Sequence, residues 1–363
     1  MPSDLEQRPY KLYRSGPKSL KARLRGEDDD LQIPSEYRRY RSGGREAPRR
    51  RVTVKRVIVG LLLALVAWLL LSLVLFLISS STSSSGVPAD AEAALASGGN
   101  MITSANTVLV IGTDQRPAGT HEAGANTSDA GSRSDTLMLW RVGGGVSRRL
   151  SIPRDTLASI PGHGMNKINA AYAFGGPALT IKTVDAFTGL KINHVIIINF
   201  ANFPKFIDAI GGVSVKTGRI CSNISGGAAN GGWTLDLQPG THHLTGIQAL
   251  TLARTRENSC NPASNDLTRE GYQQQILNGI KSQLLSPYAF FHLPWASWYA
   301  PQAVRTDMGG FTLLSMFAAS ELGGSAPVQI LKPTGGASIA GVGDALTVTP
   351  QTVQEAVSKL VNG

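Results

Sequence analysis

The sequence predicts an α/β protein with one α-β-α layered domain around a central mixed sheet, preceded by one N-terminal transmembrane helix. Three observations support this class. A long uncharged run lies near the N-terminus, β-branched runs alternate with helical patterns over the rest of the chain, and no internal repeat divides it. With 363 residues and 42% hydrophobic side chains, the chain can bury a sizeable core, so global disorder is not expected.

The positive charge of the chain is concentrated at its N-terminus. A formal net charge of +10 by itself suggests nucleic acid or an anionic membrane surface as a partner. Residues 1–56 hold 16 of the 35 Lys and Arg and 8 of the 25 Asp and Glu, so they carry +8 and leave +2 for the remainder. Because this segment is polar and has little apolar periodicity, we expect a disordered basic tail and no nucleic-acid partner.

The uncharged run covers residues 57–78, which is 22 residues. At about 1.5 Å per residue it reaches roughly 33 Å as a helix, enough to cross a bilayer core. A cleaved signal peptide is the alternative, because Ala89-Asp90-Ala91 resembles a cleavage site. The apolar run is longer than the roughly 7–15 residues of a signal peptide, and the preceding tail is too long, so the sequence favours an uncleaved anchor.

The charges that flank the run predict its orientation. Arg51, Lys55 and Arg56 adjoin its N-terminal end, whereas residues 79–93 contain no Lys or Arg. The positive-inside rule then places the tail in the cytoplasm and residues 79–363 outside the cell membrane, as a single-pass protein.

The outer part is expected to begin with a Ser/Gly/Ala-rich linker at 79–104, followed by the domain at 105–363 with its core at 107–285. An oxidising compartment favours a disulfide between Cys221 and Cys260 over two separate buried thiols.

Strands and helices alternate along the domain. Strands are expected at 107–111, 136–142, 149–152, 194–200 and 213–215, and helices at 170–174, 178–187, 201–210, 246–253 and 269–285. His242-His243 is expected as a solvated surface pair in a turn. The aromatic, proline-broken stretch 286–304 is interpreted as a loop over the core, with a cover for an apolar ligand site as the alternative.

Arginine and aspartate residues gather at the ends of the expected strands. They are Asp114, Arg116, Arg133, Asp135, Arg154 and Asp155, followed later by Arg254, Arg256, Asp266, Arg269 and Gln273. Ligands of open α/β sheets bind beyond strand ends, and guanidinium groups suit bidentate contacts with phosphate oxygens. Because Mg²⁺ prefers one or two carboxylates together with phosphate oxygens, the pattern predicts a diphosphate site with a divalent ion. Surface ion pairs are the alternative interpretation.

At these residues the chain resembles the LytR-CpsA-Psr family of bacterial cell-envelope proteins. The resemblance lies in eight blocks in the family's order: GTDQR, SRSDT, SIPRDT, KINAAYAFGG, INHVIIINF, IGGVSV, LDLQPGTHHLTGIQALTLARTR and DLTREGYQQQ. It covers residues 107–285 and continues more weakly from Arg305 onward. Tyr272 stands where the family often has Arg. The Gly/Ala-rich composition and the cysteine pair point to an actinobacterial member.

The resemblance implies a phosphotransferase that moves a glycopolymer from a polyprenyl-diphosphate carrier to peptidoglycan. It implies that Asp114 and Asp135 hold Mg²⁺ (or Mn²⁺) and that Arg154 joins them as the catalytic set, with either aspartate as the proton acceptor. It further implies a set of diphosphate-binding residues: Arg133, Arg154, Arg254, Arg256, Arg269 and Gln273. Lys167 matches a family block without an assigned role.

Two alternatives stay open at this point. A polyprenyl-diphosphate pyrophosphatase would use the same site with water as the acceptor. A non-catalytic envelope regulator or binding protein would have no need for the metal-binding aspartates.

Overall fold

The computed structural model describes residues 53–83, 86–113, 134–198, 200–224, 227–230, 232–255, 257–261, 266–324 and 326–363. The chain divides into two units, Met1–Val59 and Gly60–Gly363. The sheet, the hydrophobic cores and the candidate site all belong to the second unit.

Among the described residues, one helix is long and apolar enough to cross a membrane. Helix α2, Val54–Ser83, contains the whole predicted run and extends beyond it at both ends. Its C-terminal turns bury one stripe at helical spacing, formed by Ser72, Phe76, Ser79 and Ser80. The C-terminal half of the helix therefore packs against the domain along one face.

The segment expected to be a linker is part of the folded domain. Helix α2 continues to Ser83, the short helix α3 covers Ala89–Glu92, and Val87, Ala91 and Met101 are buried in the cores. Serine-rich composition suggested a flexible linker. The hydroxyls of Ser80 and its two successors instead donate to backbone carbonyls three residues earlier, which satisfies them within a helix.

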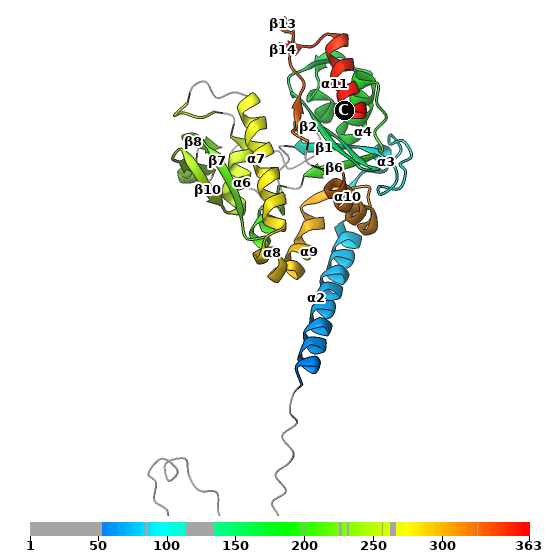
Figure 1. Cartoon of the computed structure of the whole chain (residues 1–363). Helices are drawn as coiled ribbons and strands as arrows, with labels where there is room; N and C mark the ends of the chain where they lie inside the picture. Colours follow the sequence, from blue (N-terminus) through cyan, green and yellow to red (C-terminus); the bar gives the residue numbers. More distant parts are fainter. Residues whose placement is uncertain are drawn as a thin grey trace, which may run out of the picture. The chain divides into compact units, whose positions relative to one another are not determined.

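A six-stranded mixed sheet forms the centre of the domain, as the sequence predicts (Figure 1). Strand β1 pairs in parallel with β6 and antiparallel with β2, which pairs antiparallel with β3. The short edge strands are β11, antiparallel to β6, and β12, parallel to β3. The bounds in sheet order are β11 Val304–Thr306, β6 His194–Ile198, β1 Asn106–Thr113, β2 Ser134–Gly143, β3 Val146–Ile152 and β12 Gln329–Ile330.

Both faces of the sheet are covered by helices. Leu109 and Ile111 of β1 point into a core with α3, α4 (Ala170–Thr188) and α11 (Pro350–Asn362). Val108 and Val110 point the other way, into a core with α10 (Gly310–Leu322) and Phe76 of α2. This alternation follows from the two-residue period of a strand and gives the predicted α-β-α layering.

Glycines shape two connections within the domain. The β2–β3 turn holds Gly143 at φ 109°, and a Cβ there would collide with the backbone carbonyls of Ser104 and Met101. In α4 the two expected helices are joined across a kink, with non-helical dihedral angles at Gly175 and Gly176. Glycine meets both demands because it lacks a Cβ.

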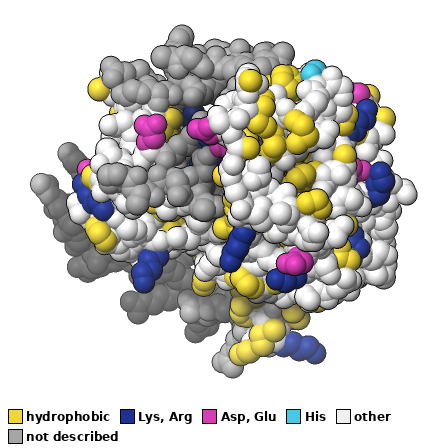
Figure 2. Space-filling model, turned by 90° about the horizontal axis from the view of Figure 1, so that it is seen from above, with side chains coloured by type: hydrophobic (Ala, Val, Ile, Leu, Met, Phe, Trp, Pro, Cys, Tyr) yellow, Lys and Arg dark blue, Asp and Glu magenta, His cyan; other side chains and the backbone are white. Residues whose placement is uncertain are grey.

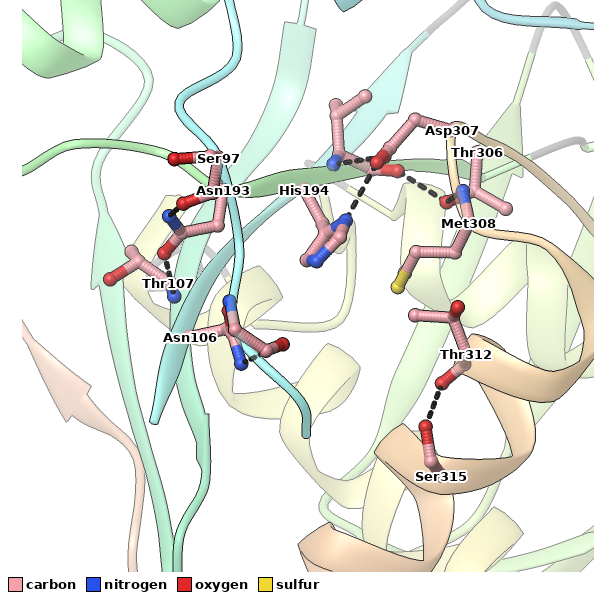
Figure 3. A network of polar contacts seen from close by, with 12 residues as sticks. Ser97, Asn106, Thr107, Asn193, His194, Thr306, Asp307, Met308, Thr312 and Ser315 are labelled. Atoms are coloured by element: carbon pink, nitrogen blue, oxygen red, sulfur yellow. Dashed lines mark hydrogen bonds and ion pairs between the residues drawn. The ribbon is translucent and has the colours of Figure 1, made fainter. Parts of the chain in front are cut away.

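A polar network fixes the edge of the sheet at which β1 and β6 begin (Figure 3). Asn193 accepts a hydrogen bond from the Thr107 amide and donates to the carbonyl of Ser97. Asp307 contacts the ring of His194 at 2.7 Å and accepts from the Val195 amide at 2.8 Å. The segments around Ser97 and Asp307 are thereby fixed to the start of β6.

A second core lies beside the sheet domain. It contains α5 to α7, two small antiparallel pairs, β7 with β10 and β8 with β9, and the buried Ala296 from the segment that follows α7. The bounds are α5 Phe203–Ala209, β7 Val213–Thr217, β8 Ile220–Ile224, β9 Trp233–Leu237, β10 Gly240–Leu244, α6 Gly246–Arg254 and α7 Asp266–Leu284, with a short 3₁₀ helix at Ala228–Asn230.

Further hairpins complete the described part of the domain. They are β4 Leu157–Ile160 with β5 Gly164–Lys167, and β13 Gly335–Ile339 with β14 Gly343–Thr347.

Two local expectations differ from the structure. His242 and His243 lie in strand β10 rather than in a turn, and their rings contact the carbonyls of Gln238 and Gly211. The stretch 286–304 forms two helices, α8 (Pro287–Phe291) and α9 (Leu293–Gln302), rather than a loop. Pro287 and Pro294 stand in the first turns, where a missing backbone N–H breaks no helical hydrogen bond.

The disulfide predicted from the sequence joins Cys221 of β8 to Cys260, 39 residues later.

Replacing both cysteines by serine should lower the free energy of unfolding by about 2–4 kcal/mol, because the unfolded chain gains conformational freedom. Denaturant unfolding of the purified chain measures this change. Reductant should produce the same loss in the wild type and none in the double variant. Equal stability of all forms would contradict a structural role for the bridge.

Candidate functional site

The register of the sheet places the end of β1, the start of β2 and the end of β3 side by side. Because β2 runs antiparallel to both neighbours, its first residues lie beside the last residues of β1 and β3. Thr113 pairs with Ser134, and Leu137 pairs with Ile152. Asp135, the second residue of β2, and Arg154, which follows β3, are therefore placed close together by backbone pairing alone.

Two guanidinium groups meet at Asp135. Arg154 Nη1 lies 3.2 Å from Asp135 Oδ1, and Arg269 Nη1 lies 4.0 Å from the same oxygen. Arg269 Nη2 also donates to the backbone carbonyl of Asp135 at 3.0 Å. The Arg269 side chain is 2% exposed, whereas those of Arg154 and Asp135 are 16% and 14% exposed. The buried arginine thus holds the backbone of Asp135, and the more exposed arginine donates a hydrogen bond to its carboxylate.

Asp155 and Lys167 extend this group of charges. Asp155 contacts Arg154 Nε at 3.5 Å and Lys167 Nζ at 3.2 Å. Lys167 ends strand β5, and hydrogen bonds from Ile168 to Thr156 and from Asn169 to Arg154 hold that strand against the loop after β3. Sequence reasoning assigned no role to Asp155 or Lys167, although both stand in blocks of the family pattern.

Gln273 joins this edge to the second core. Its side-chain oxygen accepts from Thr136 Oγ1 at 2.9 Å, and its nitrogen donates to the carbonyl of Ala253 at 3.2 Å. Ala253 precedes Arg254 at the end of α6, so the predicted Arg254 also comes to this region. We call the group formed by Asp135, Arg154, Asp155, Lys167, Arg269 and Gln273 the strand-end cluster.

The predicted site residues fall into two groups. Asp135, Arg154, Arg269 and Gln273 are brought together, with Arg254 beside them. Asp114, Arg116, Arg133 and Arg256 lie outside the described residues. Tyr272, which stands where the resembled family often has Arg, is buried in the second core. It therefore packs between helices and strands rather than adding a positive charge to the cluster.

The strand-end cluster carries an excess of positive charge. Three cationic side chains face two carboxylates, all at least partly buried. On the face shown in Figure 2, Lys and Arg side chains are scattered and adjoin Asp and Glu side chains at several places, in line with the small net charge of the sequence after the tail. A partly exposed guanidinium held in a fixed direction can bind phosphate oxygens through two parallel hydrogen bonds.

Among the described residues, no group of three or more His, Cys, Asp or Glu side chains forms a metal site. Asp135 supplies one hard carboxylate at the strand edge, which is the type of ligand that Mg²⁺ takes. Strand β1 ends at Thr113, directly opposite Ser134, and the second predicted ligand is the residue that follows in the sequence. The described donors thus fit one part of the predicted metal set.

The family model of the LytR_cpsA_psr family matches residues 76–359. Among curated proteins, the polyisoprenyl-teichoic acid–peptidoglycan teichoic acid transferase TagT of Bacillus subtilis is 34% identical over 183 residues, 49% of this chain and 53% of TagT. The probable cell wall biosynthesis protein LcpB of Corynebacterium glutamicum is 34% identical over 184 residues, 49% of this chain and 42% of LcpB. The chain spans about half the length of these relatives.

Solved structures extend the likeness to most of the domain. TagT bound to LIIa-WTA is 27% identical with a TM-score of 0.55, over 74% of this chain and 97% of that one. YwtF (TagT) with bound octaprenyl pyrophosphate lipid is 26% identical with a TM-score of 0.52, over 74% and 94%. Because the family model matches more than three quarters of this chain, the chain belongs to the LytR_cpsA_psr family.

Proposed function

We propose that this protein is a membrane-anchored phosphotransferase that attaches a glycopolymer from a polyprenyl-diphosphate carrier to peptidoglycan. The observation that carries the proposal is the meeting of Arg154 and Arg269 at Asp135 on one edge of the sheet. The relative TagT is named as a teichoic acid transferase that acts on peptidoglycan, and a TagT structure holds octaprenyl pyrophosphate. Both support a diphosphate ligand for this site.

In this proposal the arginines bind and orient the diphosphate. Arg154 combines partial exposure with a fixed partner at the strand-end cluster, so it is suited to contact phosphate oxygens directly. Because the Arg269 side chain is almost completely buried, it acts mainly by holding Asp135 in place. Arg133, Arg254, Arg256 and Gln273 would supply further contacts to the diphosphate oxygens.

The proposed reaction is a displacement at the sugar-side phosphorus. A peptidoglycan hydroxyl oxygen forms a bond to this phosphorus while the bond to the bridging oxygen breaks, and polyprenyl phosphate leaves with the electron pair. The hydroxyl proton passes to a carboxylate, Asp135 or Asp114. Negative charge grows on the leaving phosphate, where fixed guanidinium groups stabilise it more than they stabilise the starting diphosphate.

Asp114 and Asp135 would hold Mg²⁺ (or Mn²⁺) in this scheme, and the ion would neutralise charge on the diphosphate oxygens when bound. Helix α2 would be the single span, with the basic tail in the cytoplasm and the domain outside, where peptidoglycan lies. The carrier lipid would then reach the site from the outer leaflet.

Arg154→Ala tests the transfer reaction. With lipid-linked glycan, peptidoglycan and Mg²⁺, the full chain should join glycan to peptidoglycan, and the variant should be about 10²–10³-fold slower because a fixed donor to the phosphate is lost. Arg148→Ala is the matched control. Arg148 lies near the start of β3, at the opposite end of the strand from Arg154, and its guanidinium donates to the carbonyl of Val361. Its variant should transfer at a rate within about twofold of the wild type.

The same assay separates the other functions. Release of phosphate without joined glycan would favour a pyrophosphatase. No turnover at all, together with undiminished carrier binding by Arg154→Ala, would overturn both enzymatic functions and leave a binding or regulatory protein.

Asp135→Asn tests the metal proposal by a readout other than activity. In the presence of farnesyl diphosphate, the electron paramagnetic resonance signal of free Mn²⁺ reports how much ion the protein binds. The variant should bind Mn²⁺ at least about tenfold more weakly, because a charged ligand becomes a neutral amide. Asp185→Asn is the control. Asp185 lies in the last turn of α4 and pairs with Lys191, and neither residue belongs to the strand-end cluster. Equal Mn²⁺ binding by all three proteins would contradict Asp135 as a ligand.

A further inference from the structure

The segment that joins α7 to β11 is unusual for the surface of a water-soluble domain. No Asp, Glu, Lys or Arg lies between Lys281 and Arg305. Helices α8 and α9 in this segment expose large apolar side chains: Tyr288 is 47% exposed, Phe290 40%, Phe291 66% and Trp295 55%. Contiguous exposed aromatic surface of this kind marks an interaction site.

Helices α8 and α9 pack directly on the apolar helix α2. Trp68 Nε1 donates to the carbonyl of Phe290 at 3.1 Å, and the Trp68 and Trp295 rings lie 6.5 Å apart. Nearer the outer end of α2, Ser79 Oγ donates to the carbonyl of Trp298 at 2.6 Å. The exposed aromatic surface is therefore continuous with the lipid-facing surface of the proposed span.

The length of α2 sets the level of these contacts in a bilayer. If the hydrocarbon begins at Val57, next to Lys55 and Arg56, the helix rises about 17 Å to Trp68 at roughly 1.5 Å per residue. A hydrocarbon core is about 30 Å thick, so Trp68 lies about 13 Å below its outer boundary. A helix that packs at the level of Trp68 must then also lie below that boundary.

Several backbone groups of α8 and α9 have hydrogen-bond partners within the protein, as a location in hydrocarbon requires. Backbone groups in hydrocarbon need partners within the protein. Pro287 and Pro294 remove amides at the helix starts, and the Ala289 amide is capped by Ser286 Oγ at 3.2 Å. The carbonyls of Phe290 and Trp298 accept from Trp68 and from Ser79 and Gln302, and the carbonyl of Tyr288 accepts the His292 amide.

We propose that α8 and α9 form a re-entrant element that is immersed in the outer leaflet of the membrane beside α2. The proposed occupant of the exposed aromatic surface is lipid rather than another protein. This inference rests on the proposed membrane anchoring by α2, and it adds a second membrane-embedded element that the single-span topology does not include.

Hydroxyl-radical footprinting tests the immersion. The full chain is placed in nanodiscs of phosphatidylglycerol and phosphatidylethanolamine at one chain per disc, and oxidation is read by mass spectrometry. Phe291 and Trp295 should be oxidised about tenfold more slowly than Phe174, because hydrocarbon excludes water and radicals. Phe174 is the matched control, with 46% exposure and a place on α4, on the sheet domain.

Leu61 to Leu63 of α2, which are at least 59% exposed in the protein alone, separate the two proposals. Protection of these leucines with rapid oxidation of Phe291 and Trp295 would overturn the immersion and keep the anchor. Oxidation of the leucines at the rate of Phe174 would overturn the anchor itself. Protection of Phe291 that appears only with several chains per disc would show that a second copy covers the surface, which would also overturn the proposal.

Discussion

The buried guanidinium of Arg269 is the constraint on which the site depends. An uncompensated buried charge costs several kcal/mol, so the arginine must be paired. Its partners include the carboxylate and the backbone carbonyl of Asp135, and the carbonyl contact fixes how deeply α7 sits against the start of β2. One turn later, Gln273 accepts from Thr136. Consecutive residues of a strand are thus matched by residues four apart on a helix, and the second core, which contains Tyr272 and Ile276 of the same helix, is tied to the sheet.

The sheet and half of the cluster follow from local sequence. Runs such as Thr107–Ile111 have the pattern of buried strands. The glycines at 143–145 form the tight turn after which β3 returns antiparallel to β2, and this pairing places Asp135 beside the residues after β3. Two features could not be predicted in this way. The polar helix around Arg269 looks solvated in sequence, and its burial depends on a distant strand. The contact between Asp155 and Lys167 depends on the β4–β5 hairpin, whose short strands give little periodic signal.

Composition misled at two segments, the serine-rich stretch that follows the apolar run and the proline-containing stretch 286–304, for the same physical reason. Serine and proline usually break regular structure because they compete for, or lack, backbone hydrogen bonds. Next to an apolar helix these properties become useful. Small hydroxyls allow close packing and bond within their own helix, as at Ser80, or to a carbonyl of the neighbouring helix, as at Ser79. A proline at a helix start leaves no amide unpaired. The sequence pattern alone does not distinguish this use from a linker or a loop, because the difference lies in what surrounds the backbone.

Immersion of α8 and α9 would address a problem that the proposed substrate poses. A polyprenyl diphosphate has a lipid tail that stays in hydrocarbon and a charged group that must reach the strand-end cluster. Helix α9 leads into β11, where Val304 pairs with Ile198, Ile198 with Gly112, and Gly112 with Thr136. Three neighbouring-strand spacings of about 4.8 Å separate Val304 from Thr136, or about 14 Å in total. Val304, two residues beyond the end of α9, therefore lies about 14 Å from the residue next to Asp135. In the proposed arrangement the carrier presents its diphosphate to the cluster while its tail remains in the membrane.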